Sequence, residues 1–223
     1  MATDHVGGRI VLLGAGGGTG EVVSLIRHAR AHGTCAWEPV GILDDDASLK
    51  GQNRYGLPVL GAINEWPQFP DAHFLSGIAN SQTPSVRLKV AARVPVEESR
   101  WVTFVSPLAF VADTASVGVG SIVYPGAVVS SDARVGRHCV VYYQSIVQHH
   151  STVDDGCCLA AAVSIAGYTR VGKGCYLGIG VKVKDRVTIG DGALVGSGSV
   201  VIGDVPPGQK VVGVPARAIG THE

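Results

Sequence analysis

Two adjacent histidines, His149 and His150, are the side chains in this sequence best suited to moving a proton. An imidazole can be neutral near pH 7 and can then accept a proton from a reacting group, which is the task of a general base. Asp132 stands 18 positions before His150, and Gly167 stands 18 positions after His149. A structure that repeats every 18 residues would place a carboxylate beside one imidazole and a glycine beside the other. Two solvated histidines and a plain turn glycine are the alternative interpretation.

A six-residue repeat over residues 105–206 predicts such a structure. A branched aliphatic residue occupies the first place of every hexad: Val105, Val111, Val117, Val123, Val129, Val135, Val141, Val147, Val153, Leu159, Ile165, Val171, Leu177, Val183, Ile189, Val195 and Val201. The fifth place always holds a small or β-branched residue. A helix repeats at 3.6 residues and a flat strand at 2, so neither yields a strict six. The period is typical of a solenoid whose short strands meet at turns.

Three hexads per coil give about 18 residues per coil, and the coils stack at a strand spacing of roughly 4.8 Å. One large and one small inward side chain per hexad suit a narrow triangular prism. Glycine recurs at the second place, where it suits a tightly bent backbone: Gly118, Gly136, Gly172, Gly178, Gly190 and Gly196. Cys139, Cys157 and Cys175 stand at the fifth place, 18 residues apart. We expect these cysteines to stack in the core as small apolar residues.

Residues 1–104 do not follow the hexads and predict a separate small α/β domain. Apolar runs predict strands over residues 9–13, 40–43, 58–61, 72–77 and 100–104, and a helix is expected over residues 21–31. Alternation of strands and helices favours a small parallel sheet. The domain boundary is expected between residues 104 and 105.

A glycine-rich loop, residues 14–20, joins the first expected strand to the helix. The N–H groups at a helix N-terminus can cradle a phosphate. Thr19 stands where a dinucleotide fingerprint has its third glycine, so the loop does not match that fingerprint. Three aspartates, residues 44–46, close the second strand. A tight turn without a ligand and a solvated acidic turn are the alternatives.

Both halves of the chain resemble a known family. The repeat resembles the hexapeptide-repeat acyltransferases, whose fold is a left-handed parallel β-helix. A glycine-rich α/β domain ahead of such a β-helix resembles the nucleotide-sugar acetyltransferases of the sialic-acid O-acetyltransferase type. That group includes enzymes that N-acetylate UDP-, GDP- or dTDP-linked 4-amino-4,6-dideoxy sugars. The resemblance implies a Rossmann-like nucleotide-sugar-binding domain, residues 1–104, and a left-handed β-helix acyltransferase domain with a C-terminal tail, residues 105–223.

The resemblance also implies an activity, an acetyl-CoA-dependent N-acetyltransferase for a nucleotide-linked amino-deoxy sugar of polysaccharide biosynthesis. Acetyl transfer to an amine needs a base, a donor to the developing oxyanion and a groove for the pantetheine arm. The family motif Val-Asp-His-Asp/Glu places the base on His149, and its Leu-Ser/Ala-Gly places the N–H that holds the acetyl carbonyl on Gly167. Its nucleotide- and diphosphate-holding segments fall on Gly14, Gly16, Gly17, Gly18, Asp44 and Asp45.

Several positions depart from the family pattern. The family follows its base with Asp or Glu, whereas this chain has His150, so we expect Asp132, one coil below, to supply the carboxylate. Tyr142 and Cys158 stand where the family has Asn and a second His, and Cys158 is expected to face outward, near the substrate. Gly18 stands where the family usually has His. Candidates for binding CoA are Gly167, Lys173, Lys182, Lys184, Arg186 and Arg217, with solvated surface charges as the alternative for the cations.

Composition and charge limit the kinds of binding partner and the compartment that the sequence predicts. A formal net charge of zero shows no footprint of a nucleic-acid partner. The longest apolar run near the N-terminus, residues 10–15, is too short to span a membrane, and no signal-peptide pattern is apparent. The five cysteines lack CxxC spacing, and a reducing cytoplasm fits them. The resemblance implies a homotrimer with sites between subunits, and no metal is expected.

Three other functions stay open. The same fold would serve a sugar O-acetyltransferase. The departures at Tyr142, His150 and Cys158 are compatible with a catalytically degenerate nucleotide-sugar binder. A zinc hydro-lyase of the γ-carbonic-anhydrase type would need three converging imidazoles, for which His138, His149 and His150 are available.

Overall fold

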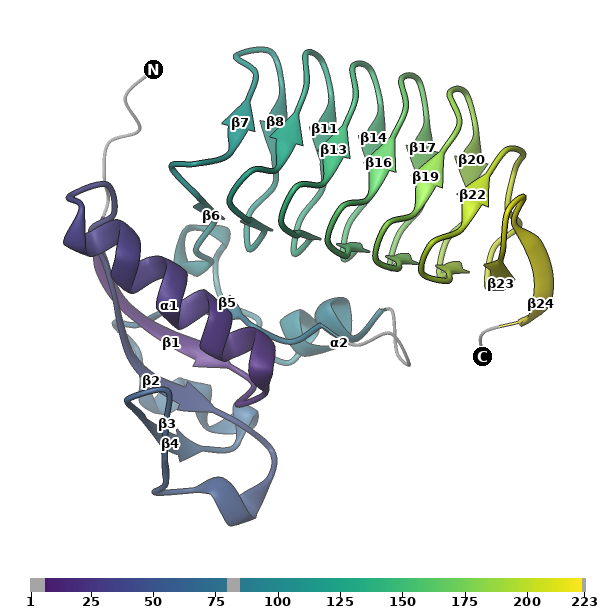
Figure 1. The fold of residues 1–223 in the computed structure, drawn as a ribbon. Coiled ribbons are helices and arrows are strands. Elements are labelled where there is room, and N and C mark those ends of the chain that lie inside the picture. The colour runs from purple at the N-terminus through teal and green to yellow at the C-terminus, as the bar shows by residue number, and fades with distance from the viewer. Residues whose placement is uncertain (1–6, 80–84, 222–223) are drawn as a thin grey trace. The chain divides into compact units, whose positions relative to one another are not determined.

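The chain folds into two compact units, seen in a computed structural model that describes residues 7–79 and 85–221 (Figure 1). The first unit comprises Met1–Ile78 and Val90–Val102, and the second comprises Ala79–Lys89 and Thr103–Glu223. Within the described residues, no helix is both long enough and apolar enough to cross a membrane.

The first unit is built on a five-stranded sheet with the order β3-β4-β2-β1-β5. Its strands are β1 (Gly8–Leu13), β2 (Trp37–Leu43), β3 (Asn53–Arg54), β4 (Leu57–Gly61) and β5 (His73–Ser76). All pair in parallel except the edge strand β3, which is antiparallel to β4. Helix α1 (Gly17–Ala31) buries Val22, Val23, Ile26 and Ala29 at helical spacing. The other helical segments are η1 (Ala47–Leu49), η2 (Ile63–Gln68), α2 (Val86–Ala92) and η3 (Glu98–Arg100).

The strand expected over residues 100–104 is absent. Trp101 makes only an isolated bridge to Phe74, and the Val102 N–H donates to the Phe74 carbonyl. The chain leaves the sheet here because Phe104 already belongs to the solenoid, where its N–H donates to the Ser121 carbonyl. The fifth strand of the sheet is instead β3, which is two residues long and polar, so apolar periodicity does not reveal it. Helix α1 begins at Gly17, earlier than expected, inside the glycine loop.

The second unit is a left-handed parallel β-helix with three sheets, which confirms the architecture predicted from the hexads (Figure 1). One sheet contains β7 (Phe110–Val111), β10 (Val128–Val129), β13 (Ile146–Val147), β16 (Ser164–Ile165), β19 (Lys182–Val183) and β22 (Val200–Val201). The second contains β8 (Ser116–Val117), β11 (Arg134–Val135), β14 (Thr152–Val153), β17 (Arg170–Val171) and β20 (Thr188–Ile189). The third contains β6 (Phe104–Val105), β9 (Ile122–Val123), β12 (Val140–Val141), β15 (Cys158–Leu159), β18 (Tyr176–Leu177), β21 (Leu194–Val195), β23 (Gln209–Val212) and the antiparallel β24 (Arg217–Thr221).

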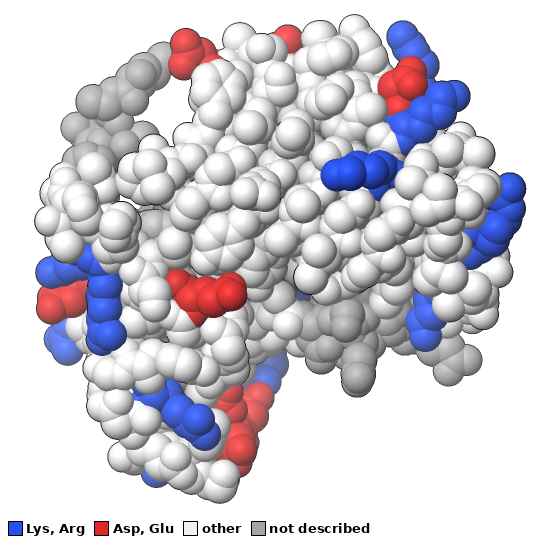
Figure 2. All heavy atoms as spheres, viewed as in Figure 1, with Lys and Arg blue, Asp and Glu red and all other residues white. Residues whose placement is uncertain are grey.

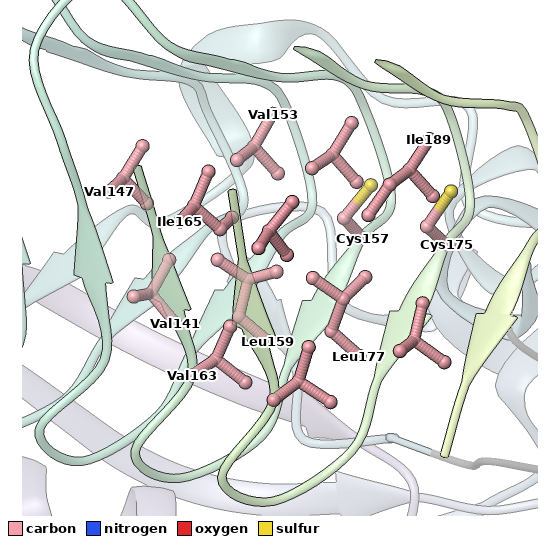
Figure 3. Packing of buried hydrophobic residues seen from close by; sticks show 14 of the residues in the cluster. Val141, Val147, Val153, Cys157, Leu159, Val163, Ile165, Cys175, Leu177 and Ile189 are labelled. Atoms are coloured by element: carbon pink, nitrogen blue, oxygen red, sulfur yellow. The ribbon is translucent and has the colours of Figure 1, made fainter. Parts of the chain in front are cut away.

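The core of the solenoid is the stack of first- and fifth-place side chains (Figure 3). From Val123 to Val201 every first-place residue is buried, and each such side chain contributes roughly 1.5–3 kcal/mol relative to an exposed one. The first coil is the exception: Val105 is 39% exposed, and Val111 and Val117 are half-buried. These three lie in the first coil, which has a neighbouring coil on one side only.

The cysteines stack in one column, as their 18-residue spacing predicts. Cys139, Cys157 and Cys175 are fully buried, and Figure 3 shows Cys157 and Cys175 at equivalent positions in adjacent coils. Each thiol points at a carbonyl of the next coil, with sulfur–oxygen distances of 3.2 Å to Asp154, 2.9 Å to Gly172 and 3.1 Å to Gly190. All five cysteines of the chain are free thiols.

The bend of the backbone falls at the fourth place of the hexad, not at the second-place glycines. Fourth-place residues such as Gly126 and His150 have φ of 72° and 58°. The second-place glycines serve close approach of coils instead. A Cβ on Gly118, for example, would lie 2.6 Å from the backbone carbon of Gly136 in the next coil.

Candidate active site

His149 and His150 occupy a corner of the prism, directly after strand β13. We call the turns that follow β10, β13, β16 and β19 the His149 corner, which comprises residues 131–132, 149–150, 167–168 and 185–186. Both histidines are exposed, and the strand pairing of β10, β13 and β16 places residues 18 apart directly above one another. Asp132, His150 and Tyr168 therefore form one column, and His149 and Gly167 lie in the adjacent one.

The side chains at this corner form a chain of contacts from a carboxylate to a free imidazole nitrogen. Asp132 Oδ2 lies 3.6 Å from His150 Nε2, an ion-pair distance rather than a short hydrogen bond. On the other side of the same ring, His150 Nδ1 lies 3.3 Å from His149 Nδ1. His149 Nε2 is the remaining nitrogen. The Cε1 edge of the ring faces the next coil, where a Cβ on Gly167 would lie 2.9 Å from Nε2 and 3.1 Å from Nδ1.

Gly167 is buried one coil above His149 and has room for no side chain. A Cβ at this position would also lie 2.6 Å from His149 Cε1. The Gly167 carbonyl accepts a hydrogen bond from the Arg186 N–H, whereas its own N–H has no acceptor among the described residues. A backbone donor without an acceptor, beside an imidazole nitrogen, is the arrangement that an oxyanion site requires.

One assignment of the protons satisfies all of these contacts. His149 Nδ1–H donates to His150 Nδ1, and His150 Nε2–H points to the Asp132 carboxylate. In that tautomer His149 Nε2 keeps its lone pair and can accept a proton from a nucleophile. When His149 becomes charged, its Nδ1–H bond to His150 orients the ring and the Asp132 carboxylate offsets the positive charge, as an orienting carboxylate does for a catalytic imidazole.

Two further residues belong to the corner. Tyr168 was missed by the sequence reasoning, and Arg186 was expected only to meet a CoA phosphate. The Tyr168 ring stacks on His150, with centroids 4.8 Å apart and an interplanar angle of 22°, and it meets His149 edge-on at 5.3 Å. The Arg186 guanidinium carbon lies 4.8 Å from the centre of the Tyr168 ring. The available signal was the spacing, because His150, Tyr168 and Arg186 are separated by 18 residues each.

Cys158 does not face outward into solvent. It is only 2% exposed, and burial raises the pKa of its thiol to about 12, partly opposed by the nearby Arg87 guanidinium. Arg87, from helix α2, is itself buried and donates to the carbonyls of His138 and Gly120. Helix α2 lies outside the hexads and far from Cys158 in the sequence. The hexad pattern therefore cannot reveal that Arg87 lies near Cys158. The raised pKa keeps the thiol protonated, which argues against a nucleophilic role.

Tyr142 belongs to a cluster of aromatic rings beside Arg87. Its ring lies 4.5 Å from Tyr124, and Tyr143 lies 4.8 Å from Tyr124 on another side. Burial lowers the pKa of Arg87, an effect that the neighbouring thiols and phenols oppose. Tyr142 and Cys158 thus share one environment in the third sheet, which is not the sheet that carries His149.

In the first unit, the glycine loop is held by bonds within the unit. Gly14 has φ of 89°, and a Cβ there would lie 2.3 Å from Ile78, so only glycine fits. The Gly14 carbonyl accepts the Thr19 hydroxyl at 2.5 Å, and the Ala15 N–H donates to Asp44 Oδ2 at 2.6 Å. Gly16 and Gly17, at the start of α1, are exposed. The N–H groups of a first helical turn have no acceptor within the helix, so they are open to an anion.

The two aspartates expected to contact the nucleotide are placed differently. Asp44 lies against the loop, where its other oxygen accepts the Asp46 N–H at 2.8 Å. Asp45 is paired with Arg93 through two bonds of 2.5 and 2.9 Å and also accepts the Ile63 N–H. The hydrogen bond from Arg93 lowers the pKa of the Asp45 carboxyl. Asp45 therefore ties the acidic turn to Ile63 and Arg93, and Asp44 is the aspartate beside the glycine loop.

The cations expected to bind CoA are exposed but do not gather at one place. Lys184 lies one coil above Ala166 at the His149 corner, whereas Lys173 follows β17 at another corner. Lys182 Nζ donates to the Ala162 carbonyl and the Ser164 hydroxyl at 2.9 and 3.0 Å. Arg217 begins β24. Figure 2 shows Lys and Arg in separate groups on the face in view, with acidic groups among them.

Within the described residues, no group of three or more His, Cys, Asp or Glu side chains could hold a metal ion. His138 is buried and follows β11, in a different sheet from the strand that precedes His149. Within a single chain, His138 therefore does not converge with His149 and His150, and the zinc alternative would need imidazoles from two subunits.

Comparison with known proteins finds similarity in the repeat and along nearly the whole chain. Residues 168–203 match the bacterial transferase hexapeptide (six repeats) family. No curated protein matches the chain. The acetyltransferase domain of PglB from Neisseria gonorrhoeae FA1090 is 26% identical with a TM-score of 0.80, covering 95% of this chain and 99% of that domain. The same domain has been solved in complex with acetyl coenzyme A.

Two other solved structures cover nearly the whole chain as well. A mutant of GDP-perosamine N-acetyl transferase from Caulobacter crescentus, in complex with CoA and GDP-perosamine, is 26% identical with a TM-score of 0.81, covering 96% of this chain and 97% of that one. WeeI from Acinetobacter baumannii AYE is 26% identical with a TM-score of 0.77, covering 95% of this chain and 100% of that one. The chain thus contains a hexapeptide repeat and resembles nucleotide-sugar N-acetyltransferases along nearly its whole length, which supports an acyltransferase.

Proposed function

We propose that this protein transfers an acetyl group from acetyl-CoA to the amine of a nucleotide-linked amino-deoxy sugar. The observation that carries the proposal is the position of His149 Nε2 beside Gly167, with His149 Nδ1 3.3 Å from His150. The similarity to an N-acetyltransferase solved with CoA and GDP-perosamine supports the choice of both substrates.

The chemistry follows from three groups at the His149 corner. The sugar amine attacks the thioester carbonyl carbon directly, and His149 Nε2 takes the proton from the attacking nitrogen. The Gly167 N–H donates to the carbonyl oxygen as it becomes an oxyanion. The C–S bond then breaks, and the proton on His149 passes to the departing thiolate of CoA. His150 holds the imidazole of His149, and the Asp132 carboxylate beyond it offsets the transient positive charge.

Binding of the two substrates is assigned to separate regions of the chain. We assign the nucleotide and diphosphate to the open first turn of α1, formed by Gly16, Gly17 and Gly18, with Gly14 and Asp44 shaping the loop. Asp45 holds the adjacent acidic turn through its ion pair with Arg93. The CoA phosphates are assigned to the exposed cations Lys173, Lys182, Lys184 and Arg217.

The assembly is part of the proposal. His149 and His150 are exposed, and Tyr168 beside them is 48% exposed, so the single chain does not enclose a reacting amine. Acyl transfer without loss to water requires such an enclosure. We therefore propose a homotrimer in which a second copy closes each site, and sedimentation at the mass of three 23.0-kDa chains tests it.

Thiol release provides the test of the reaction. Acetyl-CoA is incubated with a panel of UDP-, GDP- and dTDP-linked 4-amino sugars, and free CoA is measured for the wild type and for His149→Ala. We expect CoA release with at least one amino sugar and a loss on the order of 10²–10⁴-fold in the variant. No thiol from any amino sugar would overturn the proposal.

The product separates amine from hydroxyl as the acceptor. An amide resists hydroxylamine, whereas an O-acetyl ester is cleaved by it. A hydroxylamine-labile product would replace N-acetylation by O-acetylation while keeping the same base and donor. Binding of a nucleotide sugar, detected as a rise in melting temperature, without any thiol release would indicate a non-catalytic binder.

A further inference from the structure

One column of the His149 corner departs from the rest of the solenoid. Its fourth-place residues in four consecutive coils, Asp132, His150, Tyr168 and Arg186, all have φ between 58° and 60°. At the other two corners most of the same places hold glycine: Gly120, Gly126, Gly156, Gly174, Gly180, Gly192 and Gly198. Glycine takes this left-handed conformation without strain, whereas a bulky residue such as tyrosine does not. Strained residues of this kind cluster at functional sites.

The four side chains of this column contact one another in order. The Asp132 carboxylate meets His150, the His150 ring is stacked under Tyr168, and Arg186 lies over the other face of the Tyr168 ring. Tyr168 is the member that touches both imidazoles, because its ring also meets His149 edge-on at 82°. Its own N–H donates to the His149 carbonyl, which fixes its backbone to the base.

We infer that Tyr168 is a positioning residue, whose ring holds the imidazoles of His149 and His150 in the geometry that places His149 Nε2 beside Gly167. Arg186 keeps that ring in place from above. The inference rests on the proposed function in so far as His149 is the base, and it names a residue that the family pattern does not supply.

The physical reason is the exposure of the two imidazoles. Both histidines lie at the surface, where a side chain samples several rotamers unless its neighbours restrict it. His150 has the carboxylate of Asp132 on one edge and the Tyr168 ring on one face, and His149 has Tyr168 and Gly167 beside it. Without the Tyr168 ring, no side chain packs on His150 to keep its Nδ1 beside His149 Nδ1. A misplacement of about 1 Å at a reacting group can cost on the order of 10²-fold in rate.

Tyr168→Gly tests the inference, because its effects on stability and on catalysis are expected to have opposite directions. Glycine relieves the left-handed backbone at this place, so we expect the melting temperature to stay equal or to rise. We expect kcat to fall by roughly tenfold or more, with KM within about twofold of the wild type. Tyr168→Phe keeps the ring and is expected to retain the kcat of the wild type. Gln144→Gly relieves the same backbone conformation (φ 59°) at another corner and serves as the matched control, with kcat unchanged.

A second measurement does not depend on activity. Nitrogen-15 spectra of the histidine side chains report the tautomer and the environment of each ring. We expect the signals of His149 and His150 to change in Tyr168→Gly and to match the wild type in Tyr168→Phe and Gln144→Gly.

The outcomes distinguish failure of the proposed function from failure of the inference about Tyr168. If the wild type releases no CoA from any amino sugar, the proposed function fails, and the histidine spectra still decide whether Tyr168 positions the rings. If Tyr168→Gly keeps the wild-type kcat and the wild-type histidine signals, the inference is overturned. It is equally overturned if KM rises while kcat is unchanged, which would make Tyr168 a substrate contact, or if Tyr168→Phe is as slow as Tyr168→Gly.

Discussion

The Nδ1 atoms of His149 and His150 lie 3.3 Å apart, so the imidazole that would orient the base comes from the next residue along the chain. Asp132 approaches the far nitrogen of His150 at 3.6 Å. The family that the chain resembles has an Asp or Glu directly after its base. Here the Asp132 carboxylate contacts His150 and not the base itself, and it comes from the coil below.

This relay predicts a specific coupling between Asp132 and His150. We expect Asp132→Asn to lower kcat roughly ten- to hundredfold, less than the removal of His149 itself, because the base stays present but loses the carboxylate that offsets its charge. His150→Glu is expected to keep substantial activity, because it brings a carboxylate to His149 Nδ1 directly. In the His150→Glu background, Asp132→Asn should leave kcat unchanged. The introduced carboxylate already contacts His149, and Asp132 would only repel it.

A double-mutant cycle on kcat measures this coupling. The two single variants and the double variant are compared with the wild type at saturating substrates. Equal losses from Asp132→Asn in both backgrounds would show that Asp132 acts independently of His150.

Gly167→Ala is predicted to abolish most of the activity while leaving the fold intact. The new Cβ would lie 2.6 Å from His149 Cε1, so the imidazole must swing away from the oxyanion donor. His149 is exposed and can move, so we expect little change in melting temperature and a fall in kcat on the order of 10²-fold. Both quantities are measured on the same purified variant.

Gly203→Ala is the matched control for that variant. Gly203 occupies the equivalent place two coils further along, and a Cβ there meets no atom within 4 Å. Its kcat should equal that of the wild type. A similar loss in both variants would show that alanine disturbs the corner in general and not the contact with His149.

The burial of the cysteines predicts their reactivity. Cys139, Cys157, Cys158 and Cys175 are buried, whereas Cys35 is partly exposed. An aromatic disulfide reagent should therefore titrate one thiol per folded chain and all five after denaturation. Cys35→Ser should remove the fast reaction. Rapid labelling of Cys158 in the folded protein would contradict its burial beside Arg87.

Cys158 also predicts a loss of stability at alkaline pH. Burial raises the pKa of its thiol from 9.0 to about 12, so between these values the folded chain holds a proton that the unfolded chain has lost. The unfolded state then binds fewer protons, and the free energy of unfolding falls as pH rises, by about 1.4 kcal/mol per pH unit for this group. Below pH 9 the contribution is fully present.

Denaturant titrations between pH 8 and about 11 measure this effect in the wild type and in Cys158→Ala. The variant lacks the titrating thiol, so its free energy of unfolding should decline less steeply with pH. Cys157→Ala tests how far a second buried thiol, whose pKa burial also raises, shares the effect. Parallel slopes in the wild type and Cys158→Ala would show that Cys158 does not set the alkaline limit.

The hexads determined the β-helix without any tertiary information, because a strict period of six leaves only a stack of short strands for the aliphatic residues. The same period correctly predicted that Cys139, Cys157 and Cys175 stack and that Gly167 lies above His149. It could do so because parallel strands in register convert a sequence separation of 18 into adjacency.

The tertiary structure was needed for two features: the directions of the side chains and the contacts with segments distant in the sequence. The period places Tyr168 above His150, but only the rotamers make the rings stack and bring the two Nδ1 atoms together. Helix α2 covers Cys158 with Arg87, and the strand expected over residues 100–104 is reduced to a single bridge at Trp101. A repeat specifies the backbone of its own coils, whereas the direction of a surface side chain and the cover from a non-repeating segment are set by packing across the whole fold.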